Sequence, residues 1–203
     1  MPTDNNDHPP AIYGAILNTE TLRIPPDIKV VPVSPHHARP LSALIKENLP
    51  HLHTFLPAVA ALSTVEAAQA HLKQVVAAAE QGELYEWHIF RRDELCGAIR
   101  VSQIERDNRK ASLSCYLAAD RQGAGVATAS LRAVIAYCFK HLNLNRVEWR
   151  CASENMASQR LAKRLGFSWE GMLRQAELLD GVFVDHFVYS LLRQDASMIA
   201  QSA

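Results

Sequence analysis

The sequence feature that most constrains the fold is a turn of small residues directly before a predicted helix. The stretch "DRQGAGVATAS" (120–130) holds two glycines and three alanines and runs into the apolar "LRAVIAYCFKHL". The first turn of a helix leaves backbone N–H groups without internal partners and carries the positive end of the helix dipole. Glycine and alanine let an anion come close to these groups. The stretch therefore predicts either a diphosphate-binding turn or a tight strand-to-helix turn packed against its neighbour.

The pattern differs from two common glycine motifs that bind nucleotides. A triphosphate-binding loop requires a lysine after its second glycine, and no lysine follows Gly125. A dinucleotide-binding turn has a third glycine, where this chain has Thr128, and it lies in a parallel βαβ unit. Here the turn follows strands that read as an antiparallel meander. A diphosphate site at this turn would belong to a different architecture.

Length and composition indicate a single globular domain. The 203 residues are 48% apolar and 21% charged, and 21 basic side chains balance 21 acidic ones. A neutral chain disfavours nucleic acid as the primary partner, because phosphate neutralisation needs a basic surplus. No apolar run reaches the ~18 residues that span a bilayer, and the first residues lack the order of a secretory signal. We therefore expect neither a membrane partner nor secretion.

The cysteines and histidines indicate the compartment of the protein and whether it binds a metal. The four cysteines contain no C-x-x-C pair, so we expect reduced thiols in a cytoplasmic protein. The nine histidines lack a compact set of acidic or cysteine partners, so we expect no metal site.

The order of predicted elements indicates an α/β (α+β) domain with a mixed sheet. We expect residues 1–26 to form an extended arm, 27–193 the domain and 194–203 a tail. The expected strands are 28–33, 84–90, 94–104, 111–117, 146–151, 167–175 and 182–192. The expected helices are 34–49, 63–82, 125–141 and 153–166, with a loop or short irregular helix at 50–57. Ser63 and Glu66 have capping-box spacing, and Trp87, Trp149 and Trp169 fall in strands, where we expect them in the core.

Several motifs in this order resemble the GNAT family of N-acetyltransferases. Gln122-x-x-Gly125-x-Ala127 is similar to the family's Q/R-x-x-G-x-G/A signature. The stretches 48–57, 151–175 and 180–192 resemble the RimJ/RimL branch, which acetylates the N-termini of ribosomal proteins. The likeness covers about residues 28–192. It implies a mostly antiparallel sheet of six to seven strands, four helices on its two faces, and a splayed strand pair that holds acetyl-coenzyme A; a homodimer is compatible with it.

The resemblance also implies a role for particular residues. The glycine turn would hold the pyrophosphate, and a bulge in the strand before it would pair with the pantetheine arm, with the Leu117 backbone polarising the thioester carbonyl. Asn155 would bond the pantetheine arm. Ser158 would donate a hydrogen bond or proton to the leaving sulfur, because Ala162 stands where relatives have a tyrosine. The full expected coenzyme set is Tyr116, Leu117, Ala118, Gln122, Gly123, Ala124, Gly125, Val126, Ala127, Thr128, Asn155 and Ser158.

The sequence leaves the general base open. Relatives often have a glutamate where this chain has Ser112, and a serine cannot accept the amine's proton at neutral pH. Glu105, which also reads as a solvated turn residue, and His88 are the candidates. An α-amine with a pKa of ~8 needs less help than a lysine with a pKa of ~10.4. The missing glutamate therefore favours an α-amine acceptor.

Three functions are compatible with these observations. The leading one is transfer of acetyl from acetyl-coenzyme A to the N-terminal α-amine of a protein. The second keeps this chemistry with a small α-amine acceptor, such as an aminoacyl-nucleotide. The third is a coenzyme-binding module without turnover, because Ser112 replaces a common base.

Overall fold

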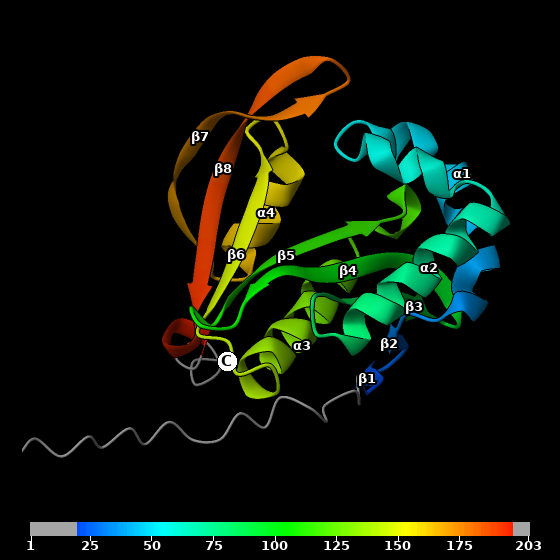
Figure 1. The fold of residues 1–203 in the computed structure, drawn as a ribbon, viewed down its shortest axis with the longest axis horizontal. Coiled ribbons are helices and arrows are strands. Elements are labelled where there is room, and N and C mark those ends of the chain that lie inside the picture. Colours follow the sequence, from blue (N-terminus) through cyan, green and yellow to red (C-terminus); the bar gives the residue numbers. More distant parts are fainter. Residues whose placement is uncertain (1–19, 197–203) are drawn as a thin grey trace, which may run out of the picture.

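A computed structural model describes residues 20–196, which form one eight-stranded sheet with helices on both faces (Figure 1). The strands are β1 (Leu22–Ile24), β2 (Ile28–Pro32), β3 (Tyr85–Arg91), β4 (Glu94–Glu105), β5 (Lys110–Leu117), β6 (Arg146–Ala152), β7 (Ser168–Leu179) and β8 (Val182–Leu192). Their order across the sheet is β1-β2-β3-β4-β5-β6-β8-β7. Neighbouring strands are antiparallel except β5 and β6, which run parallel. The expected mixed, mostly antiparallel sheet is confirmed.

In the described range the sheet has one strand more than the six to seven that the sequence predicted. The additional strand is β1, which pairs with β2 from Leu22↔Val30 to Ile24↔Ile28 and lies inside the range 1–26 expected to be an arm. Residues 25–27 form the turn of this hairpin, and the first two of them were expected to end the arm. Leu22 and Ile24 pack against the core, which holds the hairpin on the sheet. Residues 1–19 and 197–203 lie outside the described residues, so the remainder of the arm and tail stays a prediction.

Four of the α-helices in the described range form two layers. Helices α1 (Ala38–His53) and α2 (Val65–Glu80) cover one face, and α3 (Val126–Lys140) and α4 (Met156–Arg164) cover the other (Figure 1). Short 3-10 turns occupy Pro35–His37, Pro57–Leu62 and Ala119–Arg121.

The end of α1 and the start of α2 differ from the sequence prediction. Helix α1 continues through Pro50 to His53 where a loop or a short irregular helix was expected, because Leu52 is buried in the cluster under α1 and α2. Thr64, rather than Ser63, caps α2, and its Oγ1 accepts a hydrogen bond from the Ala67 amide at 3.2 Å.

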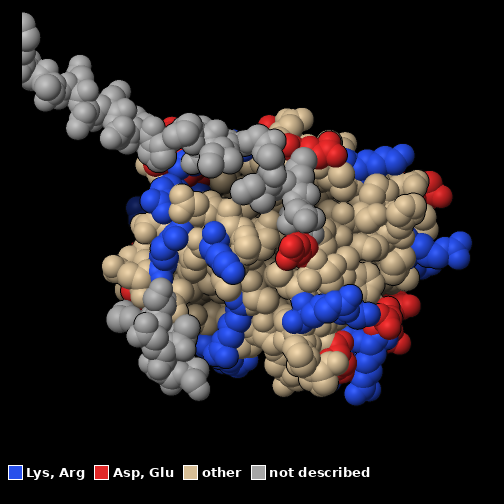
Figure 2. All heavy atoms as spheres, turned by 90° about the horizontal axis from the view of Figure 1, so that it is seen from below, with Lys and Arg blue, Asp and Glu red and all other residues tan. Residues whose placement is uncertain are grey.

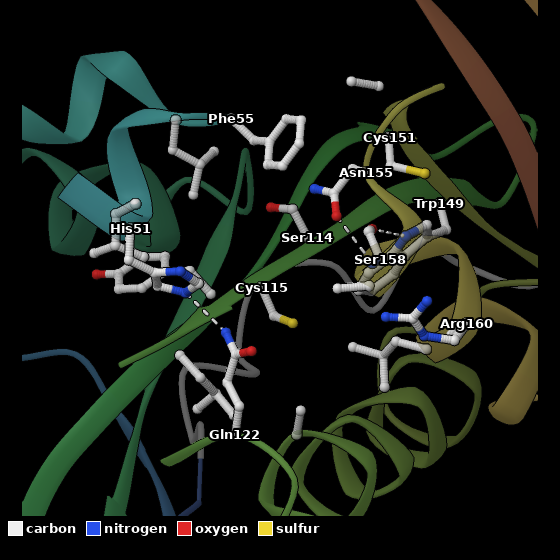
Figure 3. Close-up of a pocket in the computed structure, with 18 of the residues that line it drawn as sticks. His51, Phe55, Ser114, Cys115, Gln122, Trp149, Cys151, Asn155, Ser158 and Arg160 are labelled. Carbon is white, nitrogen blue, oxygen red and sulfur yellow. Dashed lines mark hydrogen bonds between the residues drawn. The ribbon is translucent and has the colours of Figure 1, made fainter. Parts of the chain in front are cut away.

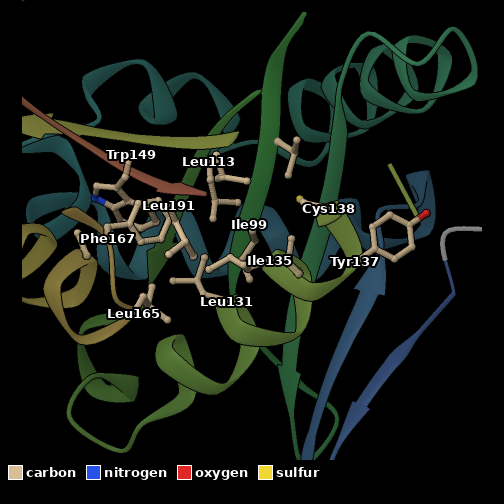
Figure 4. Packing of buried hydrophobic residues seen from close by; sticks show 14 of the residues in the cluster. Ile99, Leu113, Leu131, Ile135, Tyr137, Cys138, Trp149, Leu165, Phe167 and Leu191 are labelled. Carbon is tan, nitrogen blue, oxygen red and sulfur yellow. The ribbon is translucent and has the colours of Figure 1, made fainter. Parts of the chain in front are cut away.

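The main hydrophobic cluster joins the sheet to α3 and α4 (Figure 4). Members drawn there include Ile99, Leu113, Leu131, Ile135, Cys138, Leu165, Phe167 and Leu191. Trp87 and Trp149 are buried in it, as predicted. Trp169 is 59% exposed, so its predicted core position is wrong. It lies on β7, an edge strand of the sheet, and the alternation of a strand sequence does not tell an edge strand from a central one.

The sheet opens between β5 and β6. The two strands pair at three positions, from Lys110↔Arg146 to Ser112↔Glu148, and then diverge. Strand β6 instead pairs along its whole length with β8, and β5 stays paired with β4. The edge of β5 that faces β6 is therefore left without a strand partner beyond Ser112. This splay was expected from the family resemblance, and it is confirmed.

The bulge expected in β5 is absent. The register between β4 and β5 is continuous from Gly97↔Leu117 to Ser102↔Ser112. The irregularity lies in β4 between Ser102 and Glu105, where Gln103 has a φ of 51°. The free edge of β5 thus comes from the divergence of two strands and not from a bulge.

Surface charges of both signs are scattered over the face in Figure 2, with uncharged surface between them. Within residues 20–196, we find no helix of the length and apolarity needed to cross a membrane.

Gly97 permits the close approach of β4 to the end of β5. A Cβ at this position would lie 2.1 Å from the Tyr116 carbonyl oxygen, which is a backbone atom and cannot move aside cheaply. We predict that Gly97→Ala lowers the free energy of unfolding by about 1–3 kcal/mol, because the two strands must separate. Chemical denaturation measures the change. Ser102→Ala, on the same strand, is the control and should stay within about 0.5 kcal/mol; equal stability of the two variants would contradict the prediction.

An ion pair ties β6 to the edge strand β7 across β8. Arg146 Nη1 donates to Glu170 Oε1 at 2.6 Å, and Ser190 Oγ of β8 donates to the same oxygen at 2.6 Å. These hydrogen bonds, those from Arg146 above all, lower the pKa of Glu170 to about 2.

This lowered pKa predicts an acid-sensitive contribution to stability. A carboxyl whose pKa is lower in the folded than in the unfolded state stabilises the fold above the unfolded pKa of ~4.3, and the contribution is lost as pH falls towards 2. We expect the stability of Glu170→Gln to fall less than that of the wild type over this pH interval. Unfolding midpoints measured across a pH series test this. Glu66→Gln, in the exposed first turn of α2, should leave the profile unchanged. Parallel curves for wild type and Glu170→Gln would refute this role.

Candidate active site

A cavity of about 540 Å³ lies at the splay between β5 and β6 (Figure 3). Its walls come from the C-terminal end of α1 and the segment after it, from β5, from the glycine turn with the start of α3, and from β6 and α4. Glu177 of β7 and His186 of β8 complete the lining. The cavity therefore brings together segments that are far apart in the sequence.

The glycine turn presents an uncapped helix start to this cavity. Gly125 is the N-cap residue of α3 with a φ of 76°, and Gly123 has a φ of 79°, conformations that favour glycine. A Cβ at either position would meet no atom within 4 Å, so the space beside the turn is open. Among the described residues no side chain caps α3, whereas Thr64 caps α2 and Asn155 caps α4.

The intrahelical bonds of α3 begin only after its first turn. The Ala129 amide donates to the Gly125 carbonyl at 2.9 Å, so the amides of residues 126–128 have no partner within the helix. Unpaired amides at the positive end of the helix dipole fit a phosphate group. Of the two interpretations that the sequence left open, this geometry favours the anion-binding turn.

Most of the expected coenzyme residues line the cavity. They are Tyr116, Leu117, Gln122, Gly123, Gly125, Val126, Ala127, Thr128, Asn155 and Ser158. Ala118 and Ala124 are not among its lining residues. The Ala118 amide donates to the Cys96 carbonyl at 2.8 Å, on the β4 side. Because successive strand amides point to opposite edges, the Leu117 N–H points into the splay.

Neither candidate base lies on the cavity wall. Glu105 is exposed at the far end of β4, where it accepts from Asn108 at 2.8 Å and pairs with Lys110 at 3.0 Å, and these contacts lower its carboxyl pKa. His88 is fully buried, 3.0 Å from His37 between the two Nδ1 atoms, and burial lowers its pKa to about 3. Ser112 donates to Gln103 at 2.6 Å and is likewise outside the lining.

Asn155 and Ser158 are held by hydrogen bonds at the start of α4. Asn155 Oδ1 accepts from the Ser158 amide at 3.0 Å, and the amide nitrogen of Asn155 points towards the cavity (Figure 3). Ser158 Oγ accepts from Trp149 Nε1 of β6 at 2.8 Å. Both side chains are therefore fixed before any ligand arrives, and both face the space that the glycine turn also faces.

A pair of ionisable groups on the cavity wall was not predicted from the sequence. His186 Nε2 and Glu177 Oε2 are 2.8 Å apart, and their side chains are 16% and 45% exposed. Glu177 follows a register shift in β7, so its position depends on how β7 and β8 pair. His186 lies in the stretch 180–192 that carried the family resemblance, and Glu177 follows the stretch 151–175 by two residues, so the resemblance was the available signal. A carboxylate–imidazole pair can accept a proton from a group in the cavity.

Positive side chains lie near the first turn of α3. Arg160 and Arg164 of α4 line the cavity, and Arg164 Nη1 donates to Thr128 Oγ1 at 3.4 Å. Arg121 also lines it but is paired with Glu94 at 2.6 Å and Asp120 at 3.2 Å. The uncapped amides and the two α4 arginines make this end of the cavity suited to a phosphorylated ligand. Among the described residues, no group of three His, Cys, Asp or Glu side chains is placed to hold a metal ion.

Comparison with known proteins identifies the family. The family described as "Acetyltransferase (GNAT) domain" matches residues 27–168, and the chain belongs to this family. It is an N-acetyltransferase with the GNAT fold. The Escherichia coli (strain K12) ribosomal-protein-serine acetyltransferase is 30% identical over 172 residues, which cover 85% of this chain and 96% of that protein.

Solved structures show the same fold. RimL, a ribosomal L7/L12 α-N-protein acetyltransferase in complex with coenzyme A, has a TM-score of 0.82 and 24% identity, covering 85% of this chain and 98% of that one. Mycobacterium smegmatis RimJ, in complex with CoA-disulfide, has a TM-score of 0.81 and 23% identity, covering 90% and 93%.

The cap of α4 generates a prediction about stability. Asn155→Ala should lower the free energy of unfolding by about 1 kcal/mol, because the Ser158 amide loses its acceptor. Asn155→Asp keeps a capping oxygen and is the matched control, with stability close to that of the wild type. Thermal or chemical unfolding distinguishes the two variants. Equal losses would show that capping is not what Asn155 contributes.

Proposed function

We propose that this protein transfers the acetyl group of acetyl-coenzyme A to the N-terminal α-amine of a protein, of the ribosomal-protein type. The observation that carries the proposal is that one cavity is lined both by the unpaired amides of α3 and by the Glu177–His186 pair. The first group suits a diphosphate and the second suits a reacting amine. The name of the E. coli relative and the coenzyme in the RimL structure support the same assignment. A ribosomal-protein acceptor would place the enzyme in the cytoplasm.

The residues present fit the coenzyme. The amides of residues 126–128 would hold its pyrophosphate, with Arg160 and Arg164 adding positive charge beside them. The amide nitrogen of Asn155 would bond the pantetheine arm. When bound, acetyl-coenzyme A supplies an activated thioester, whose C–S bond breaks as the amine nitrogen bonds the acetyl carbon. The Leu117 N–H, directed into the splay, would stabilise negative charge on the carbonyl oxygen.

The Glu177–His186 pair replaces the base that the sequence left open. We assign it the removal of a proton from the acceptor's ammonium group, in place of Glu105 or His88. An α-ammonium with a pKa of ~8 is within reach of such a base near neutral pH, whereas a lysine with a pKa of ~10.4 is much less so. Ser158 would donate a hydrogen bond to the departing thiolate, which leaves as the thiol with one of the amine's protons, while the second proton passes to solvent.

The acceptor assignment is tested by mass spectrometry after incubation with acetyl-coenzyme A. The mixture contains peptides with free N-termini beginning with serine or alanine, the same peptides with blocked N-termini and an internal lysine, and small amines including an aminoacyl-nucleotide analogue. Acetylation of the free peptide N-termini supports the proposal. Acetylation confined to the small amines favours the second candidate function, and coenzyme binding without any acetylated product favours a binding module.

The base assignment predicts a loss of turnover in Glu177→Gln. We expect kcat/KM for the acceptor peptide to fall at least about 100-fold, because general-base catalysis contributes on that order. The pH–rate profile should change in shape, because the pair loses its carboxylate while His186 remains, and a change in packing alone would not alter this shape. Steady-state thiol release over a pH series measures both.

Asp180→Asn is the matched control for Glu177→Gln. Asp180 lies on the same hairpin, pairs with His53 at 3.3 Å and is not among the cavity-lining residues, so its variant should keep wild-type kinetics within about threefold. An unchanged profile in Glu177→Gln would remove Glu177 from the mechanism without affecting the coenzyme site.

A further inference from the structure

We infer that Trp149 is a positioning residue for the transfer reaction, because its indole N–H orients the Ser158 hydroxyl towards the leaving sulfur. The inference rests on the proposed function, in which Ser158 meets that sulfur. It adds a residue that the sequence analysis treated as core alone.

The hydrogen bonds around Ser158 determine where its proton can point. A serine hydroxyl has one proton to donate and lone pairs to accept, while an indole N–H can only donate. Trp149 Nε1 donates to Ser158 Oγ at 2.8 Å and so occupies a lone pair. The hydroxyl proton is therefore directed away from the indole and is free for another acceptor.

A sulfur atom of the protein lies on the same wall of the cavity as Ser158. The side chain of Cys151 is 6% exposed and lines the cavity, and Ser158 partly offsets the rise in the pKa of the Cys151 thiol that burial causes. Figure 3 shows Trp149, Ser158 and Cys151 grouped together beside Asn155 at the β6–α4 side of the cavity. The arrangement thus offers the hydroxyl proton to sulfur on the side where the pantetheine arm would run. A coenzyme thiolate, being charged, would compete for it more strongly than a neutral cysteine.

The indole is held rigidly enough to serve as a fixed donor. Trp149 is 3% exposed on β6, whose backbone pairs it with Tyr189 of β8. The ring of Phe167 packs edge-on against it, with centroids 6.0 Å apart and planes at 63°. The Ser158 backbone is fixed from the other side by the Asn155 cap. Donor and acceptor therefore belong to two elements that are each anchored independently, which preorganises the hydroxyl.

A buried indole N–H needs a hydrogen-bond acceptor for the stability of the fold alone, so the test must separate a positioning role from a stabilising one. The chain offers a matched control in Trp87 of β3. Trp87 is fully buried in the same cluster, but among the described residues its Nε1 has no hydrogen-bond partner. Trp149→Phe and Trp87→Phe thus remove similar volume, and only the first removes a hydrogen bond to Ser158.

The kinetic experiment is a double-mutant cycle on thiol release with an N-terminal peptide acceptor. Trp149→Phe should lower kcat about tenfold with the KM for acetyl-coenzyme A unchanged, because the lost hydrogen bond acts on the leaving group. In a Ser158→Ala background the same change should have no further effect on kcat. Trp87→Phe should reduce thermal stability but leave kcat within twofold.

A second readout does not depend on turnover. The indole Nε1–H signal of Trp149, assigned by its loss in Trp149→Phe, should shift in the proton–nitrogen correlation spectrum of Ser158→Ala and on addition of coenzyme A. If Trp149→Phe does not fold, replacing Trp149 by 3-benzothienylalanine, whose ring has sulfur in place of N–H, keeps the shape and tests the same bond.

The outcomes distinguish this inference from the proposed function. Loss of kcat in Trp149→Phe that vanishes in the Ser158→Ala background supports it. If Ser158→Ala is slow but Trp149→Phe and the benzothienyl variant keep wild-type kcat, the inference is overturned and the proposed function stands. If the wild type acetylates no amine, the proposed function fails. Separately, an Nε1–H signal that does not shift in Ser158→Ala would show that Trp149 does not contact Ser158 and would overturn the inference.

Discussion

The constraint on which the rest of the structure depends is the short parallel pairing between β5 and β6. Three paired positions keep the sheet continuous, and the divergence beyond them opens the cavity. The divergence persists because each strand is fully paired on its other side, β5 with β4 and β6 with β8. The backbone edge of β5 is thereby free to bond a ligand as if that ligand were a strand, while the protein retains its hydrogen-bonded sheet.

The start of α3 and the start of α4 face this opening but are built differently. Helix α4 is closed by the side chain of Asn155, whereas α3 begins at Gly125 without any such cap in the described chain. The difference is chemical as well as structural, because an uncapped N-terminus keeps amides available for a phosphate. Capped α4 instead provides a rigid base on which Ser158 stands. Stability and function thus make opposite use of a helix N-terminus.

Local patterns in the sequence predicted the part of the site that depends on neighbouring residues. Gly123 and Gly125 are residues that readily adopt the positive φ of a tight turn, and Asn155 and Ser158 share one turn of helix, so both groups could be predicted from the sequence. Glu105 was selected because it lies at the end of the strand that precedes the stretch with Ser112. The structure places the Glu105 carboxylate at the end of β4 that is far from the cavity. Strand pairing, and not sequence spacing, decides which end of a strand lies near a site.

The Glu177–His186 pair could not be read in the same way. Its members face each other across two strands whose register shifts before Glu177, and sequence spacing does not place a side chain beyond such a shift. Trp149 is a similar case, since its strand position indicated burial correctly but gave no sign of the serine that accepts its N–H. The burial of Trp149 could be predicted from strand alternation, whereas its hydrogen-bond partner on another element could not.

By itself the sequence determined the α/β class, the order of most elements and the position of the glycine turn before α3. These follow from interactions between residues a few positions apart, which fix helices, turns and caps. The tertiary structure alone decided the β1 hairpin, the exposed position of Trp169, the origin of the free β5 edge and the ionisable pair on the cavity wall. Each of these depends on which strands become neighbours and in what register, and that is settled by packing of the whole sheet against its helices.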